Sequence, residues 1–525
     1  MLESGDENPD ARTQALAEGH AVGLPYFKLD EARLRYLGGA TNHWGRFARP
    51  FPDSDFAAKP WLPGSGWPIG LRELGGYSAQ AERVVGLTEH RWTTDWWDAR
   101  DRFTPLPVDP ARVVTRVVQI ISQGPKSLGV RYHDELAAAR TVTVYRHANV
   151  TSIDLDESGR SVREISVAVL SGPRFTVQAR HFVLAAGGLE NPRLLLASSS
   201  RFPQGVGNQN DLVGRYFLEH PRFVAGALLP SSPNLSVGFY EAHNVGSSRI
   251  SAYLAAADDV QVREQILDVQ ARLAPAYTPE FAAALTSDEA AELRDLVGAV
   301  RDIELGPLAE HLPSVTADLV TANQYLVPGA PIPVPYPHVL AKLARSSAAE
   351  RAALLPRLFG NIAAAGYQEA TGKGPVKQLN VVTRIDPAPN RDSRVLLVED
   401  RDELGMRRIA LDWRLSDADR YSVRRSMEIF AAEFARAGLG RLRITFDDAG
   451  SDWPDDLAGG GHHIGTTRMS PDPKQGVVDT DCAVHGIGNL HVAGSSVFPT
   501  SGSATPTLMI IALALRLADR LRGLL

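Results

Sequence analysis

The chain has 525 residues, of which 44% are hydrophobic and 22% are charged, and its formal net charge is -6. These proportions are those of a folded globular protein, and they exclude a disordered chain or a fibrous repeat. A net charge of -6 provides no basic footprint, so nucleic acid is excluded as an expected partner. A length of 525 residues exceeds what one core normally supports, which predicts two domains.

Three local features concern the location of the protein. The N-terminal stretch MLESGDENPDARTQ is polar from its third residue and has no signal-peptide segment. The longest apolar run, LMIIALAL at 508–515, is far shorter than the roughly 20 residues that span a bilayer. Cys482 is the single cysteine, which excludes an internal disulfide and suits a reducing compartment. We therefore expect a cytoplasmic protein without a membrane span.

The first part of the chain predicts short elements followed by a strand and a helix. Residues 1–50 are typical of loop and short helix, and they end in a glycine-rich stretch. Residues 140–172 alternate in polarity, which predicts strands that reverse direction at Gly159. The segment HFVLAAGGLENPRLLLASS at 181–199 predicts an apolar strand that runs through glycines into a helix.

The middle of the chain, residues 210–450, predicts a second domain of mixed structure. Segments rich in Ala and Leu predict helices at 281–300, 340–365 and 418–437. Strands are predicted at VKQLNVVTRI and SRVLLVED, and the proline-rich stretch at 326–340 predicts a surface excursion.

The last segment predicts a strand, a long Gly/Ser/Pro loop and a closing helix. Thr505 is predicted to cap this helix and Pro506 to take its first position, before apolar residues with helical spacing. The amino end of a helix carries partly positive N–H groups that suit an electron-rich ligand edge. An amphipathic helix packed on a sheet explains the same pattern, and the sequence leaves both interpretations open.

Four segments, in this order, resemble the glucose-methanol-choline (GMC) family of FAD-dependent oxidoreductases, in particular its bacterial branch near pyranose oxidase. They are LESG (2–5), GGATNHWGRFARP (38–50), VLAAGGLENPRLLLAS (183–198), and the tail from HHIGTTRM to VVDTDCAVHGIGNLHVAGSSVFPTSGSATPTL (462–508). The resemblance implies an α/β fold, α+β as a whole. An incomplete Rossmann-like FAD-binding domain (1–209 and 451–525) would be interleaved with a substrate domain (210–450) on a mostly antiparallel sheet with helices.

The resemblance also assigns a catalytic base. The family's catalytic histidine begins an H-x-x-G-T pattern, and HHIGT places His462 in that position. His463 would then point away, toward packing or a supporting hydrogen bond. Oxidation of an alcohol by hydride transfer to flavin N5 requires a group that accepts the hydroxyl proton, and an imidazole suits this.

A second catalytic position departs from the family's pattern. The family has His or Asn shortly before the closing helix, and this chain has Thr505. Threonine makes hydrogen bonds but carries no proton near neutral pH, so Thr505 would orient the substrate oxygen or only cap the helix. The segment DLVGRYFLEHP also resembles the branch, but His220 within it is assigned only a packing role.

The cofactor implied by the resemblance is FAD, and no metal is expected. His43 would attach FAD covalently, as in pyranose oxidase-type enzymes, or would line the flavin without that bond. Glu3 would bind the adenosine ribose and Val150 the adenine. The complete set of implied cofactor-binding residues is Glu3, Gly38, Gly39, Asn42, His43, Trp44, Val150, Ala186, Gly187, Gly494, Ser495, Pro506 and Thr507.

One expected motif is absent from the sequence. A dinucleotide-binding fold opens with a strand, GxGxxG and a helix, and LESG corresponds to the end of the second strand. A late start codon, a truncation or a genuine loss would each explain this. The chain that begins at Met1 is expected to bind FAD weakly.

The sequence thus favours an FAD-dependent oxidoreductase that oxidises a CH–OH group of a sugar, glycoside or related alcohol. The electrons would pass to oxygen or another acceptor. Two alternatives remain: a non-catalytic or truncated relative that binds FAD poorly, and an oxidase of a sterol or other apolar alcohol.

Overall fold

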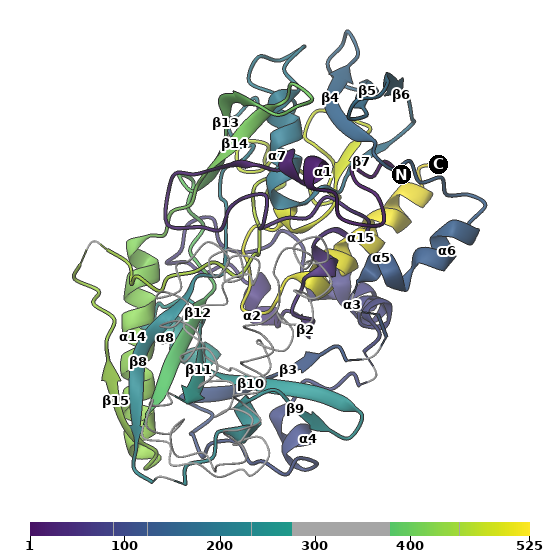
Figure 1. Ribbon diagram of the computed structural model, residues 1–525. Coiled ribbons are helices and arrows are strands. Elements are labelled where there is room, and N and C mark those ends of the chain that lie inside the picture. Colours follow the sequence, from purple (N-terminus) through teal and green to yellow (C-terminus); the bar gives the residue numbers. More distant parts are fainter. Residues whose placement is uncertain (88, 123, 126, 233, 276–377, 451) are drawn as a thin grey trace, which may run out of the picture.

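The computed structural model describes residues 1–525 except 88, 123, 126, 233, 276–377 and 451 (Figure 1). A large sheet that includes β3, β8 and β10–β12 lies at one end of the molecule, and α7 and β4–β6 lie at the other (Figure 1). The predictions for 281–300, 326–340 and 340–365 lie outside the described residues.

The large sheet is antiparallel throughout its described part. Its eight strands run in the order β15 (Gly440–Ile444), β8 (Arg222–Pro230), β12 (Leu379–Ile385), β11 (Val269–Pro275), β10 (Ser248–Ala256), β3 (Val113–Ile120) and β2 (Phe47–Ala48), with β9 (His243–Val245) also paired to β10. The strand predicted within VKQLNVVTRI is confirmed as β12, and so is the mostly antiparallel sheet with helices.

One face of this sheet is covered by α14 (Asp417–Arg436), which confirms the helix predicted at 418–437. Its N-terminus carries a capping box, in which Asp419 accepts hydrogen bonds from the backbone and hydroxyl of Ser416. Alternate residues of the central strands pack in one core with the helix; they include Ala271, Leu273, Val381 and Ile385, packed with Val423, Met427 and Phe430. The residues between them on each strand therefore face the opposite side of the sheet.

The other end of the molecule contains smaller sheets. The alternating segment forms the meander β4 (Asn149–Leu155), β5 (Val162–Ala168) and β6 (Arg174–Val177), with Gly159 in the first turn at φ +69, as predicted. The predicted strand SRVLLVED is confirmed as β13, in a sheet of β1 (Gly19–Ala21), β14 (Arg407–Asp412) and β13 (Arg394–Arg401).

A parallel strand pair delivers the two helices nearest the candidate site. β7 (Phe182–Leu184) pairs with β16 (Leu490–Val492), although more than 300 residues separate them in sequence. β7 leads directly into α7 (Gly187–Ala197), and β16 leads through a long loop into α15 (Thr507–Arg522). Both predicted strand and helix successions are confirmed, as is the α/β class.

The predicted capping of the closing helix by Thr505 is wrong. The helix begins at Thr507, one residue later than predicted, with Pro506 as the flanking residue. The Thr505 hydroxyl instead donates to the carbonyl of Phe47 at 2.7 Å, at the edge of the large sheet. Because its single proton is used there, Thr505 ties the helix to β2 rather than satisfying the helix N–H groups.

The remaining helices of the described residues are short, apart from α3. They are α1 (Ala11–Ala15), α2 (Asp53–Phe56), α3 (Leu71–Val85), α4 (Thr94–Asp98), α5 (Leu128–Arg131), α6 (His133–Ala138), α8 (Asp258–Glu264), and the 3-10 turns η1 (Gly39–Asn42), η2 (Gly238–Tyr240) and η3 (Ser495–Val497). Within the described ranges, no helix has the length and apolar character needed to cross a membrane. The domain boundaries at 209 and 450 and the cytoplasmic location stay predictions.

Candidate active site

The segment that contains His462 and His463 is held against α7 by a hydrogen bond to a helix carbonyl that has no donor within the helix. Pro192 lies inside α7 and has no N–H, so the carbonyl four residues earlier, on Gly188, lacks its usual helical partner. The Thr466 hydroxyl donates to that carbonyl at 2.6 Å. A Cβ on Gly188 would lie 2.2 Å from the carbonyl oxygen of His463, so only glycine allows this approach.

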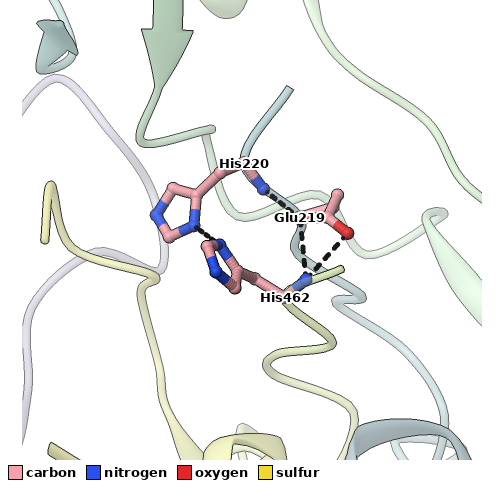
Figure 2. A group of neighbouring side chains, drawn as sticks. All are labelled: Glu219, His220 and His462. Atoms are coloured by element: carbon pink, nitrogen blue, oxygen red, sulfur yellow. Dashed lines mark hydrogen bonds between the residues drawn. The ribbon is translucent and has the colours of Figure 1, made fainter. Parts of the chain in front are cut away.

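A short antiparallel bridge places a second segment beside the first. Leu218 and Ile464 exchange backbone hydrogen bonds of 2.9 and 3.1 Å. This bridge brings Glu219 and His220 next to His462, 242 residues later in the chain (Figure 2). Sequence reasoning assigned His220 only to packing and gave Glu219 no role.

The hydrogen bonds of the two histidines determine which nitrogen of His462 is free. His220 Nε2 lies 2.8 Å from the carbonyl of Gly502, which can only accept, so Nε2 carries the proton. Burial lowers the pKa of His220 to about 3, so its ring is neutral and Nδ1 is an acceptor. His462 Nδ1 lies 2.8 Å from that acceptor and must donate to it (Figure 2). The lone pair of His462 is therefore on Nε2.

The surroundings keep His462 neutral near neutral pH. Burial lowers the pKa of His462 well below 6.5, and His220, Arg384 and His463 lower it further. Among the described residues, Nε2 of His462 has no hydrogen-bond partner in the protein. The site therefore presents an unprotonated ring nitrogen.

His463 lies in aromatic packing, as predicted. Its ring centroid is 6.0 Å from that of Tyr26 and 6.1 Å from that of Phe217. Burial lowers the pKa of His463 to about 3, and its backbone carbonyl accepts a 2.7 Å hydrogen bond from the hydroxyl of Ser495.

Glu219 holds the two histidine segments together. Its side chain is fully buried, and it accepts backbone N–H bonds from His220 at 2.7 Å and from His462 at 3.0 Å. The Tyr26 hydroxyl donates a third bond to it. Burial raises the pKa of Glu219, although these hydrogen bonds oppose the shift. The sequence signal that was missed is an acid placed between the apolar pair Phe217 and Leu218 and a histidine.

Glu219, His220 and His462 are close enough to ligate a metal, with one atom of each within 4.8 Å of the others. The carboxylate and the two Nδ1 atoms are already used by the protein. The two Nδ1 atoms share one proton, and the carboxylate accepts the hydrogen bonds from the two backbone N–H groups and the tyrosine hydroxyl. The cluster is therefore a hydrogen-bonded pair of imidazoles on a carboxylate support.

The cluster is connected to the loop that leads into α15. Gly502, which accepts from His220, lies four residues before Pro506. The next residue, Ser503, donates its N–H to Asp55 at 3.1 Å. The structure thus brings His462, His220 and the start of the closing helix into one neighbourhood. Thr505 is close in sequence to this loop, but its proton is used by Phe47, so it can only accept from a substrate.

Three predicted cofactor-binding glycines share a geometry that fits a closely approaching cofactor. Gly39, Gly187 and Gly494 have φ values of +50, +88 and +111, in the region that favours glycine. No atom lies within 4 Å of the position that a Cβ would take on any of them. Backbone that is left-handed and unobstructed in this way can come close to a ligand, so these residues fit FAD.

Other predicted cofactor residues form a second group around the N-terminal segment. Glu3 exchanges backbone bonds with Tyr145 and Ala148, beside Val150 in β4. Leu37, just before Gly38, donates its N–H to Asp6 at 2.8 Å. This places Glu3, Val150 and the turn that begins at Gly38 in one region, as their proposed common role requires.

The rest of the predicted cofactor residues have defined local contacts. Asn42 donates to the carbonyl of Leu37 at 3.1 Å, and His43 Nε2 lies 3.3 Å from the Tyr36 hydroxyl. Trp44 packs with a small apolar cluster that includes residues of α15. Ala186 flanks α7 and donates its N–H to Asn191 at 2.8 Å, and Thr507 begins α15 after Pro506.

Comparison with known proteins identifies the family of the C-terminal part of the chain. Residues 389–514 match the family model described as GMC oxidoreductase. Residues 389–514 are therefore a GMC oxidoreductase C-terminal domain. This match indicates FAD as the cofactor.

Two curated proteins are similar to parts of the chain. It is 22% identical to 2-methyl-1,2-propanediol dehydrogenase of Mycolicibacterium austroafricanum over 38% of this chain and 43% of that protein. It is 30% identical to paromamine 6'-oxidase of Streptomyces fradiae over 28% of this chain and 26% of that protein. The match thus spans less than half the length of each relative.

A solved structure has the same fold as the chain. Pyridoxine 4-oxidase from Mesorbium loti superposes with a TM-score of 0.51, at 15% identity, over 99% of this chain and 94% of that one. The likeness extends across both ends of the molecule.

Proposed function

We propose that this GMC oxidoreductase oxidises a CH–OH group of a sugar, glycoside or related alcohol, with His462 as the base. The observation that supports this most is the lone pair that the hydrogen-bond chain from Gly502 through His220 leaves on His462 Nε2. A neutral imidazole nitrogen without a protein partner is what an alcohol O–H needs as its proton acceptor.

In this proposal each residue of the cluster has one task. The substrate hydroxyl donates a hydrogen bond to His462 Nε2 and then gives up its proton to that atom. When bound, FAD supplies the acceptor for the hydrogen and electron pair that leave the same carbon. His220 keeps Nδ1 of His462 protonated, and Glu219 fixes the backbone of both histidines. Thr505 would accept a hydrogen bond from a second hydroxyl.

The low pKa of His462 also has a consequence for the second half of the cycle. Burial and the neighbouring charge of Arg384 disfavour the imidazolium. The proton taken from the substrate is therefore held weakly and leaves readily, which returns the base to its neutral form before the next turnover.

The relatives' names are consistent with a CH–OH donor, since one refers to a diol and another, C-glycoside 3-oxidase of Microbacterium trichothecenolyticum, to a glycoside. Both dehydrogenases and oxidases occur among them. We therefore include oxygen or another electron acceptor in the proposal. The place of the chain in a branch near pyranose oxidase, and the cofactor roles of the residues named for FAD, are parts of the same proposal.

Anaerobic bleaching of the flavin tests this function. Protein reconstituted with FAD is mixed without oxygen with a panel of sugars, glycosides and simple alcohols, and the yellow flavin absorbance is followed. Bleaching by at least one of them, lost in His462→Ala while the oxidised spectrum is kept, is the expected result. His20→Ala, which removes a surface histidine bonded to Asp400, is the control. Bleaching at an unchanged rate in His462→Ala, or by no alcohol at all, would overturn the proposal.

A further inference from the structure

The face of the large sheet opposite α14 carries three arginines on adjacent strands. Arg222 on β8 and Arg384 on β12 are direct cross-strand partners. Arg272 on β11 is opposite Val382, two residues from Arg384, so it lies on the same face as a diagonal neighbour. Like charges in these positions normally destabilise a sheet.

In the described part of the chain, these three partly buried arginines have no carboxylate partners. Among the described residues, none of the three forms an ion pair with a carboxylate. Arg272 lies over the ring of Phe47 with 5.1 Å between them, and Arg384 donates to the carbonyl of Ser503 at 2.8 Å while its Nε is buried without a partner. Arg116, on β3 of the same sheet, shows the usual alternative: it pairs with Asp258 and Asp268.

The acids in the neighbourhood are engaged elsewhere. Asp268 pairs with Arg116, and Asp386 accepts from the Ser501 hydroxyl at 2.5 Å. Asp456, the acid nearest Arg222 in electrostatic terms, accepts the N–H of Val224 at 2.9 Å. Glu219 supports His220 and His462. The charges of these acids partly offset those of Arg222 and Arg384, but none of the acids forms an ion pair with the three arginines in the part of the chain that the structure describes.

Burial and mutual repulsion both lower the pKa values of these arginines. Burial, together with the charges of Arg272 and Arg384, lowers the pKa of Arg222 to about 9. Burial, together with the charge of Arg384, lowers the pKa of Arg272 to about 10. The protonated guanidinium groups repel each other where solvent screens them little.

A polar group beside the cluster also lacks a partner. Tyr253 on β10 is fully buried, and its hydroxyl has no hydrogen-bond partner among the described residues. The pairing of Leu254 with Ala271 puts Tyr253 next to Arg272 on the arginine face. A buried hydroxyl without a partner costs about 1–3 kcal/mol. It could donate to the same anion that the arginines attract.

The arginine cluster is continuous with His220 and His462. Arg384 donates to Ser503, and the preceding residue, Gly502, accepts from His220. The charge of Arg384 contributes to the low pKa of both His220 and His462. A group held by these arginines would therefore belong to the molecule whose hydroxyl reaches His462.

We propose that Arg222, Arg272, Arg384 and the Tyr253 hydroxyl bind an anionic group, a carboxylate or a phosphate, on the hydroxy compound that is oxidised at His462. This inference rests on the proposed function and narrows its substrate class to acidic sugars, sugar phosphates or hydroxy acids. Guanidinium groups bind carboxylate and phosphate through paired N–H bonds, and a bound anion removes their mutual repulsion. A sterol or other apolar alcohol would leave all three charges without a counterion.

The first experiment compares matched substrates. The FAD-loaded protein is mixed anaerobically with D-glucose, D-glucuronate or D-glucose 6-phosphate, and kcat/KM for flavin reduction is measured. We expect at least one of the two anions to exceed glucose by tenfold or more, and the better anion identifies carboxylate or phosphate as the bound group. Arg272→Gln and Arg222→Gln should each reduce the anion-to-glucose ratio by about 10- to 100-fold. Arg443→Gln, which removes an exposed charge from β15 of the same sheet, should leave the ratio unchanged.

The outcomes separate this inference from the proposed function. Glucose reduction equal to or faster than that of both anions, with ratios unaffected by Arg272→Gln and Arg222→Gln, would overturn the anion site and leave the oxidoreductase function standing. If none of the three reduces the flavin, calorimetric titration with D-glucuronate and with inorganic phosphate decides. Binding that Arg272→Gln abolishes supports the anion site, and absence of binding of both overturns it.

Stability provides a readout that is independent of turnover. Without ligand, Arg272→Gln is expected to raise the melting temperature, because it removes one of three mutually repelling charges. It is also expected to reduce the increase in melting temperature that the better anion produces in the unsubstituted protein. A lower melting temperature together with an undiminished ligand-induced increase would contradict the proposal.

Discussion

The strongest prediction concerns His220, which touches no substrate in our account but determines the protonation of His462. In His220→Gln, the longer amide can still donate to the carbonyl of Gly502, but it no longer places an acceptor where Nδ1 of His220 stands. In His220→Asn, the amide oxygen takes the place of Nδ1, so the 2.8 Å bond from His462 Nδ1 has a replacement. The two variants therefore separate the acceptor from the bulk of the imidazole.

The magnitude follows from the environment of that bond. A buried N–H left without an acceptor costs about 1–3 kcal/mol. This cost falls only on the tautomer of His462 that has its lone pair on Nε2, so the productive fraction decreases by roughly 5- to 150-fold. We expect His220→Gln to reduce the rate of flavin reduction by about 10- to 100-fold, and His220→Asn to retain most of it.

The assay is anaerobic rapid mixing of each FAD-loaded variant with the best alcohol of the panel, with the flavin spectrum and melting temperature as folding controls. A rate for His220→Gln within threefold of the unsubstituted protein would refute the tautomer argument. So would an equal loss in both variants with unchanged stability, because the acceptor atom would then not be the important feature.

Three further predictions concern the support of the site. Glu219→Gln keeps the shape of the side chain but has one acceptor oxygen for three donors. We therefore expect it to lower the free energy of unfolding by about 1–3 kcal/mol and to slow flavin reduction. A urea unfolding curve that matches that of the unsubstituted protein would contradict this. Gly188→Ala puts a Cβ 2.2 Å from the His463 carbonyl oxygen and should destabilise the protein by about 1–3 kcal/mol in thermal melts. The control is Gly75→Ala in α3, where no atom lies within 4 Å of the new Cβ, and it should be neutral or slightly stabilising. Burial, with the nearby charge of Asp386, raises the pKa of Asp55 from 3.8 to about 8. The folded protein then binds more protons than the unfolded chain between these values, so its stability falls as pH rises through that window. Asp55→Asn should flatten this decline by about 1–3 kcal/mol between pH 5 and pH 8, and an unchanged pH dependence of the melting temperature would show that Asp55 is ionised in the folded protein.

Local pattern was sufficient to predict the elements that surround the site. The apolar run before AAGG and the tail after NLHV each have a strong period and clear glycine boundaries, and both became a strand followed by a helix. The same local reasoning was wrong for Thr505. A residue just before a helix normally caps it, but the carbonyl of Phe47, 458 residues earlier, is the partner of its hydroxyl. Nothing in the neighbouring sequence indicates that contact.

The support of His462 could not be read from the sequence for a related reason. Glu219 and His220 reach it through one bridge between Leu218 and Ile464, two residues that are separated by more than 240 positions. An isolated bridge of this kind produces no periodic pattern and no motif in the sequence. The arginine cluster is similar, because Arg222, Arg272 and Arg384 lie in three separate strands and become neighbours only through the register of the sheet.

The measurement that tests the central claim most directly is NMR of the ring nitrogens of His462 in protein labelled at histidine, with His462→Ala to assign the signals. Our account predicts a neutral ring near neutral pH, with a proton on Nδ1 and none on Nε2. A proton found on Nε2, or on both nitrogens, would contradict the claim that His462 presents a lone pair to the substrate hydroxyl.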